Sequence, residues 1–291
     1  MNELWILLTA ILVSVTCSIV GVFLILRKMS MIADAISHTV LFGIVMSYIM
    51  THTLSGWSMF IGAVLTGIAT AYIVQLLQTT GIQEDAAIGI TFTVIFAVSV
   101  LLVTLFAGSV HLDVEHVLMG EIAFVPWERL TVGAVMMPKA VWILGFVLLL
   151  NIAFFGLFYR VMNVSTFDVS YAVTIGLPVV LIHYLFMTMV SLTTVAAFDS
   201  VGAILVVALL IGPPATAYLI SRTVPQMFFW SISLGVISTV IGYVFATWLD
   251  TSISGMMATA VGFVFLVVLI VTKLQNRKLN AVGEGETAIG Q

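Results

Sequence analysis

Charged residues are scarce in this sequence. Asp, Glu, Lys and Arg make up 8% of its 291 residues, whereas an ordinary soluble domain has roughly 25%. Hydrophobic residues account for 62%, and the mean hydropathy is +1.26. This composition excludes an ordinary soluble protein. The net charge of −4 says little about partners, because nearly all charges lie at the ends of apolar runs.

Two kinds of chemistry are also missing. The single cysteine, Cys17, excludes a disulfide within the chain and a thiolate metal cluster. No GxxxxGK[ST] loop is present, so any ATP that this protein uses must be hydrolysed by another chain. No HExxH pair is present either, which argues against a zinc metalloprotease. The sequence therefore does not predict an enzyme.

Long apolar runs are abundant instead. A helix needs about 20 residues to span a bilayer. We therefore expect an all-α integral membrane protein with about nine transmembrane helices, the sixth and seventh close enough to form a broken pair. They form one transmembrane domain, 1–275, followed by a polar tail, 276–291, that we expect to be disordered. The predicted spans are 4–26, 31–50, 57–78, 86–107, 140–159, 178–196, 200–221, 226–249 and 255–272.

The positive charges orient these spans. With nine spans and a cytoplasmic C-terminus, seven Lys and Arg residues are cytoplasmic and two are outside. This excess follows the positive-inside rule and predicts a multi-pass membrane protein with its tail in the cytoplasm. The cytoplasmic residues are Arg27, Lys28, Arg160, Arg222, Lys273, Arg277 and Lys278, and the outer ones are Arg129 and Lys139.

One long connection, 108–139, then lies outside. It is either a solvated loop with an interfacial aromatic, Trp127, or a docking surface or vestibule that gathers cations. Its acidic and imidazole residues are His111, Asp113, Glu115, His116, Glu121 and Glu128.

The stretch MSMIADAISHTVLFG, residues 29–43, places a carboxylate and an imidazole inside the second span. Asp34 and His38 are four residues apart and share one helix face. At 1.5 Å per residue from Arg27 they lie about 10 and 16 Å deep. A charge at that depth costs at least roughly 2.5–3.5 kcal/mol, so it should face protein, water or an ion. Small neighbours would let another helix approach closely.

This Asp–His pair has two interpretations. It could be a buried hydrogen bond that locks two helices together, or a cation site or proton relay, which we favour. Two ligands are too few for a transition-metal cage, but two copies of the helix around a twofold axis would supply two carboxylates and two imidazoles. Such a set suits Mn²⁺, Zn²⁺ or Fe²⁺ and disfavours Cu⁺, which prefers sulfur.

A second stretch, STFDVSYAVTIGLPVV, residues 165–180, predicts a short helix along the cytoplasmic surface. Ser165 and Asp168 have the spacing of a capping box. Gly176 is a helix stop, and Pro178 follows it. The helix is either an ordinary connection or a lever on which a cytoplasmic partner pushes.

A third stretch, DSVGAILVVALLIGPPATAYLISR, residues 199–222, has prolines in mid-span. Pro213 and Pro214 remove backbone donors, and Gly212 lets another backbone approach. Kinked helices line the pathway in many transporters, although they also serve for packing.

Taken together, these motifs resemble those of the family-3 ABC permeases, which import manganese, zinc and iron. MSMIADAISHTVLFG resembles the family's D-A-I-S-H segment, and TFDVSYAVTIGL is similar to its coupling segment, F-D-x-x-x-A-x-x-x-G. GAILVVALLIGPPATA and VLMGEI also resemble family segments. The resemblance covers about residues 4–272, and Pro214, where the family usually has Ala, is one departure.

The resemblance implies a type II-like ABC importer permease in the bacterial cell membrane that forms a homodimer. A separate ATP-binding subunit dimer would bind its cytoplasmic face, and a metal-binding lipoprotein would deliver the ion from outside. Lipid surrounds such a protein, no nucleic acid binds it, and a divalent Mn, Zn or Fe ion is its cargo rather than a permanent cofactor. The implied metal residues are Asp34, His38 and, more weakly, Glu121, and the implied coupling residues are Phe167, Asp168, Ala172 and Gly176.

Two other functions compete with this one. An ABC permease for a metal chelate, of the siderophore or cobalamin type, would need a wide cavity and no direct ligands, so Asp34 and His38 argue against it. A secondary transporter could use the same two residues as a proton relay, but the coupling segment would then have no role.

Overall fold

The structure is a computed structural model that describes residues 2–52, 56–106, 122–127, 129–132 and 135–289. Within these ranges nine helices are long and apolar enough to cross a membrane, which confirms the predicted architecture. A helix satisfies most of its backbone hydrogen bonds internally, as a segment in hydrocarbon must. They are α1 (Asn2–Leu26), α2 (Met31–Thr51), α3 (Gly56–Thr79), α4 (Glu84–Phe106), α6 (Lys139–Phe167), α8 (Val179–Val201), α9 (Ala203–Ile220), α10 (Val224–Leu249) and α11 (Ile253–Ile289).

Four short elements complete the described chain. The 3₁₀ helix η1 (Ile122–Phe124) and the strands β1 (Arg129–Val132) and β2 (Val135–Pro138) belong to the connection that was expected to be a loop. The two strands form an antiparallel hairpin, so the fold is not purely helical. The short helix α7 (Val169–Thr174) follows α6. All six acidic and His residues predicted for the outer connection, Glu121 among them, lie outside the described residues.

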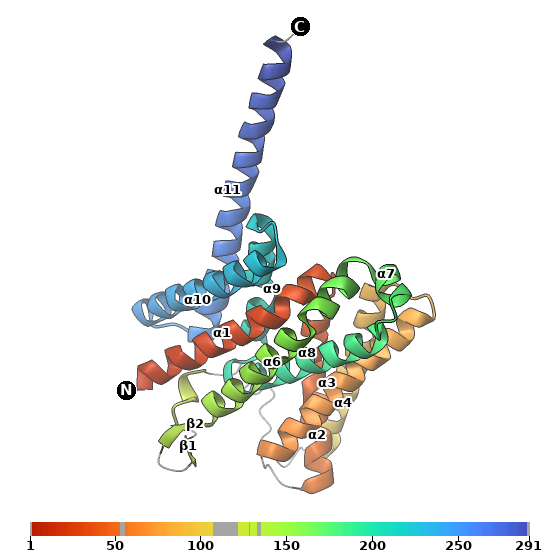
Figure 1. Cartoon of the computed structure of the whole chain (residues 1–291). Helices are drawn as coiled ribbons and strands as arrows, with labels where there is room; N and C mark the ends of the chain where they lie inside the picture. The colour runs from red at the N-terminus through yellow and green to blue at the C-terminus, as the bar shows by residue number, and fades with distance from the viewer. Residues whose placement is uncertain (1, 53–55, 107–121, 128, 133–134, 290–291) are drawn as a thin grey trace.

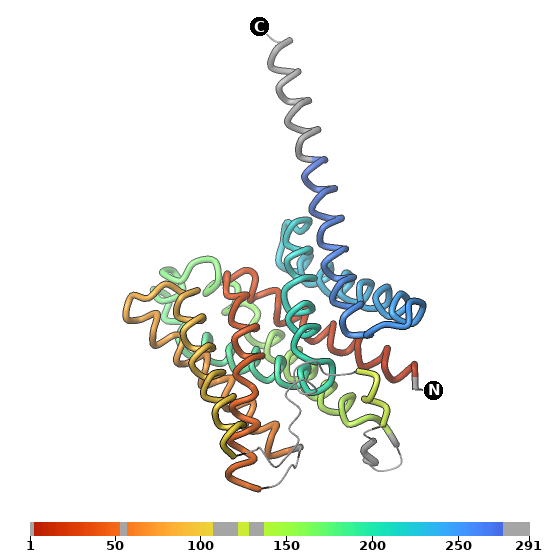
Figure 2. The backbone as a smooth tube through the Cα atoms, turned by 180° about the vertical axis from the view of Figure 1, so that it is seen from behind, coloured from red at the N-terminus to blue at the C-terminus, as the bar shows by residue number. Residues whose placement is uncertain are grey.

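The long helices pack as two groups (Figures 1 and 2). Helices α2, α3 and α4 contact one another, and so do α9, α10 and α11. Helix α1 contacts α9 and α10 on one side and α6 and α8 on the other, while α8 also contacts α2 and α3. Helices α1 and α8 therefore join the two groups, which also touch directly where α2 contacts α9, and α6 packs against both α1 and α8.

An aromatic cluster fills the core where α1 meets its neighbours. The Phe23 ring stacks on Phe155 of α6 at 5.4 Å between centroids and meets Phe186 of α8 edge-on at 6.4 Å. Phe228 of α10 lies 5.8 Å from Phe23. Phe23 and Phe186 are fully buried. Four helices are thus fixed relative to one another by ring contacts, which add to the burial of the rings themselves.

Polar residues expected on one side of the membrane meet at one end of the molecule. Lys139 of α6 lies 3.6 Å from Asp199 of α8. The charge distribution predicts that both residues lie on the outer side of the membrane. At the opposite end Arg27 bonds to Ser165 and Thr166, near the start of α7. The helices therefore alternate in direction as the charge pattern predicts.

The break between α8 and α9 is a single residue. Gly202 has φ +81° and ψ 165°, a conformation open to glycine but strained for other residues, and α9 begins directly after it. This explains why the sixth and seventh apolar runs follow so closely in the sequence.

Two boundaries differ from the predictions. Helix α6 runs to Phe167 rather than 159, because the helix continues past its apolar part and through Arg160. Helix α11 runs to Ile289, whereas a disordered tail was expected from 276 (Figure 1). Once a helix is nucleated, each added residue contributes one hydrogen bond, so a helix can extend past its apolar part.

Candidate functional site: a polar pair in the membrane and an exposed helix at one end

Asp34 and His38 lie on the same face of α2, as their spacing predicts. The distance between His38 Nε2 and Asp34 Oδ1 is 3.6 Å, which is an ion pair when the imidazole is protonated. It is longer than a good hydrogen bond. The two side chains are therefore close enough to act on one ligand without being committed to each other.

The opposite face of α2 packs tightly against α3. Gly43 and Gly62 meet backbone to backbone, so that a Cβ on Gly43 would overlap the Gly62 carbonyl group. Thr39 and Thr70 are hydrogen-bonded across the same interface at 3.0 Å between their hydroxyl oxygens. This packing uses small residues, as expected for helices associating in lipid. It leaves the Asp34 face pointing away from α3.

His38 lies against α4. Its ring is 5.7 Å from the rings of both Phe92 and Phe96. Even so, the side chain of His38 is 36% exposed and that of Asp34 is 40% exposed. A carboxylate cannot face hydrocarbon at this depth without a large cost, so this face must meet water, a second protein surface or an ion.

One chain supplies only part of a metal site. Among the residues that the structure describes, no group of three or more His, Cys, Asp or Glu side chains is placed to hold a metal ion. Asp34 and His38 provide one carboxylate and one imidazole, donors that suit manganese, zinc or iron. Any further ligand must come from outside the described residues, from water or from another copy.

The short helix α7 is capped by Asp168. Its carboxylate accepts a hydrogen bond from the backbone N–H of Tyr171 at 2.8 Å, the standard role of an N-cap. The predicted capping box was wrong, because Ser165 still belongs to α6 and accepts from Arg27. Gly176 ends the segment with φ +77°, as predicted.

Helix α7 shows an apolar surface to its surroundings. Phe167, Val169, Tyr171, Val173 and Ile175 are between 50% and 66% exposed. Ala172, by contrast, is fully buried, so its side chain packs inside the chain and any part it has in coupling is indirect. An exposed apolar helix at the end of a membrane domain, rimmed by polar residues, is typical of a protein interaction site.

The two prolines of α9 do not break the helix. Pro213 and Pro214 lie inside a continuous α9 and are buried. The Leu210 carbonyl receives no helical hydrogen bond, because Pro214, four residues later, has no N–H. This carbonyl lies against Gly21 of α1, where a Cβ would overlap it. Gly212 faces Val261 of α11. The three residues are thus packed among α1, α10 and α11, and the structure does not bring them to Asp34 and His38, whose ring contacts are with α4.

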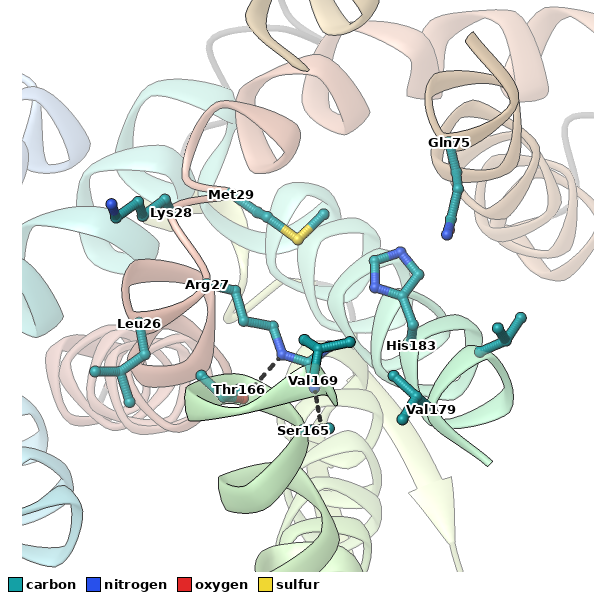
Figure 3. A pocket seen from close by; sticks show the side chains of 11 residues that line it. Leu26, Arg27, Lys28, Met29, Gln75, Ser165, Thr166, Val169, Val179 and His183 are labelled. Atoms are coloured by element: carbon teal, nitrogen blue, oxygen red, sulfur yellow. Dashed lines mark hydrogen bonds between the residues drawn. The ribbon is translucent and has the colours of Figure 1, made fainter. Parts of the chain in front are cut away.

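A cavity of about 410 Å³ opens at the end of the molecule that carries α7 (Figure 3). His183, Gln75 and Met29 face one another across it, whereas Lys28 points away from them (Figure 3). Arg27 also lines it, bonded to α6. In the sequence, Arg27 served only to orient the spans and to mark the membrane surface. No local motif marks these residues, because their partners are far away in the chain.

Known proteins are similar to this chain in sequence and fold. A profile of the ABC 3 transport family matches residues 2–272. The chain is 53% identical over 261 residues to the manganese transport system membrane protein MntD of Bacillus subtilis (strain 168), covering 89% of this chain and 88% of that protein. It is 42% identical over 266 residues to the zinc transport system membrane protein TroD of Treponema pallidum (strain Nichols), covering 91% of this chain and 72% of that protein. PsaBC from Streptococcus pneumoniae in complex with Fab, a solved structure, matches with a TM-score of 0.75 at 32% identity, covering 91% and 89%.

Proposed function

Because the chain belongs to the ABC 3 transport family, we propose that it is the membrane-spanning permease subunit of an ATP-driven importer of divalent transition-metal ions. Manganese is the first candidate for the cargo, with zinc or iron as alternatives. The similarity to a manganese permease at 53% identity supports this order, and so does the mixed oxygen and nitrogen donor set of Asp34 and His38.

The observation that carries the proposal is the partial exposure of Asp34 and His38 inside a membrane span. Two copies of the chain, related by a twofold axis beside this face, would bring together two carboxylates and two imidazoles. The double charge of the ion would keep Asp34 ionised and His38 neutral, since ligands must give up their protons to bind. A homodimer with the ion bound would therefore offset the electrostatic cost and complete the ligand set at once.

Other subunits supply what this chain lacks. The sequence has no nucleotide-binding loop, so a separate ATPase dimer would hydrolyse ATP and dock on α7 from the cytoplasm. A metal-binding lipoprotein would deliver the ion to the outer side. With the ends of the helices assigned by charge, the C-terminus is cytoplasmic and the protein lies in the bacterial cell membrane.

The experiment removes each donor separately. We expect Asp34→Asn and His38→Asn to lower manganese uptake by cells at least about tenfold, because even supporting groups around a metal are worth roughly 10–100-fold. The matched controls are Asp250→Asn and His52→Asn. These residues are exposed and have left-handed backbone conformations, with φ +51° and +48°, which Asn tolerates.

The controls should transport at the normal rate, and all four variants should reach the membrane in equal amounts. Normal uptake by both Asp34→Asn and His38→Asn would mean that the pair is only a structural contact. Uptake that follows the proton gradient and persists without ATP would instead make the pair a proton relay.

A further inference from the structure

Arg27 connects two segments that are far apart in the sequence. It follows the last residue of α1, and its guanidinium donates to the last turn of α6. The Nε atom lies 3.0 Å from Thr166 Oγ1, and an Nη atom lies 2.9 Å from Ser165 Oγ (Figure 3). Ser165 and Thr166 donate their own protons to the Met162 carbonyl, so their lone pairs are free to accept from Arg27.

The guanidinium is held in place by the aromatic cluster. Its carbon lies 5.1 Å from the centre of the Phe186 ring, within the range of a cation–π contact. Phe186 in turn contacts Phe23 and Phe155. Arg27 is therefore seated on the rigid junction of α1, α6 and α8 rather than extended into solvent.

Arg27 keeps its charge although it is largely enclosed. Burial lowers the pKa of Arg27 to about 10, which is still well above physiological pH. Within the described ranges no carboxylate lies at ion-pair distance from it. The hydroxyls of Ser165 and Thr166 thus receive charge-assisted hydrogen bonds, which are shorter and stronger than neutral ones.

Each end of this contact leads directly to a functional segment. Asp168, the N-cap of α7, follows Thr166 after one residue. On the other side a tight turn leads to α2, with Lys28 at φ +61° and the Met29 N–H bonded to the Leu24 carbonyl at 2.9 Å. Asp34 lies in the first turn of α2. No flexible stretch separates Arg27 from either segment.

We propose that Arg27 is a positioning residue that links the exposed helix α7 to the helix that carries Asp34 and His38. A displacement of α7 by the ATPase would pull on Ser165 and Thr166, and through Arg27 on the start of α2. The cavity beside the contact leaves unfilled volume into which these segments can move. This inference rests on the proposed function, because it assumes that a partner pushes on α7.

The test uses the permease purified with its ATPase partner. In proteoliposomes we would compare Arg27→Met, Arg27→Lys and the double variant Ser165→Ala/Thr166→Val, which removes the acceptors instead of the donor. Arg160→Met is the matched control, since Arg160 is an exposed arginine of α6. One readout is the manganese transported per ATP hydrolysed.

A second readout does not depend on transport. Met31, in the first turn of α2, is 50% exposed, so a Met31→Cys substitution can report on this helix by its rate of reaction with a maleimide. Cys17 is buried, and protein without the substitution measures the background. The rate is compared without nucleotide and with ATP and vanadate.

In the intact contact, ATP should change the reactivity of the cysteine at position 31. Arg27→Met and the Ser165→Ala/Thr166→Val variant should each abolish that change and lower transport per ATP by roughly tenfold while ATP hydrolysis continues. A protein with all three substitutions should transport little less per ATP than either variant, because both remove the same contact. Arg27→Lys should restore part of both signals, and Arg160→Met should resemble the unmodified protein.

The outcomes separate the two proposals. If no divalent metal is transported but the reactivity change depends on Arg27, the proposed cargo is wrong, whereas the link between α7 and α2 through Arg27 is supported. If the variants lower hydrolysis and transport in proportion, or keep the reactivity change, Arg27 only stabilises the fold. A complex in which position 31 never responds to ATP would also overturn the link.

Discussion

Gly43 is a residue at which the backbones of α2 and α3 meet. A Cβ there would overlap the carbonyl of Gly62 and approach the Cα of Ala63, and neither is a flexible side-chain end that could move aside. Because α2 also carries Asp34 and His38, the position of this contact fixes where the polar pair stands in the membrane.

We predict that Gly43→Ala destabilises the protein by roughly 1–3 kcal/mol, the usual cost of overpacking. Gly89→Ala in α4 is the matched control, since nothing lies within 4 Å of a Cβ built there. The control should be neutral or slightly stabilising, because Ala has the better helix propensity. Thermal unfolding of the detergent-purified proteins measures both. Equal melting temperatures would show that the two backbones can separate at no cost.

Single residues were predictable where their chemistry is local. Asp34 and His38 stand out in the sequence because a charge inside a span is expensive whatever surrounds it, and the structure confirms that i, i+4 spacing puts them on one face. Their role toward a metal stays a prediction. The link made by Arg27 was not predictable, since its acceptors, Ser165 and Thr166, are ordinary hydroxyls with no distinguishing pattern. Glu121 stays a prediction.

Among the elements, α7 is short and yet exposes several apolar side chains. It has six residues, Val169–Thr174, too few to be stable alone, and is held by Asp168 at its start and Gly176 just beyond its end. Its exposed Tyr171 and Val173 do not serve the fold of this chain, because they face outward.

We predict that Tyr171→Ala weakens binding of the ATPase subunit by at least about tenfold, as loss of an aromatic anchor typically does. Tyr218→Ala is the matched control, because Tyr218 is 58% exposed near the end of α9 and Tyr171 is 55% exposed. Co-purification with a tagged ATPase at increasing salt measures the difference. Should both variants retain the ATPase equally, α7 is not the main docking element.

The ends of this element show where sequence reasoning succeeds and fails. Gly176 was predictable, since a left-handed stop followed by Pro178 is a local signal. The start was misplaced, because both Ser165 and Asp168 are good caps and only the packing of α6 decides between them. The prolines of α9 lie inside a continuous helix, and a tightly packed neighbour can accommodate the freed carbonyl. The kink predicted there stays a prediction.

For the whole molecule, the number of spans was predictable and their arrangement was not. Each helix must be apolar and about 20 residues long to cross the bilayer, whatever its neighbours. Lipid tails are as apolar as a protein core, so the hydrophobic pattern does not distinguish the face that meets lipid from the face that meets another helix. The division into two packed groups therefore required the structure.

The orientation in the membrane is open to a direct test. We predict that Ser170→Cys, in α7, reacts with a membrane-impermeant maleimide only after cells are opened, because the positive-inside rule puts it in the cytoplasm. Ser252→Cys, between α10 and α11, makes the same exchange at an exposed site and should react in intact cells. The two cysteines reacting from the same side would disprove the alternation of the helices.

Gly202 joins two helices that have different surroundings. Helix α8 contacts α2 and α3, helix α9 contacts α10 and α11, and this one residue connects them. Because α8 and α9 cannot part at Gly202, any rotation of one against the other would displace their far ends most. Helix α9 has 18 residues and is about 27 Å long, so a turn of about 10° at Gly202 would move its other tip by about 5 Å.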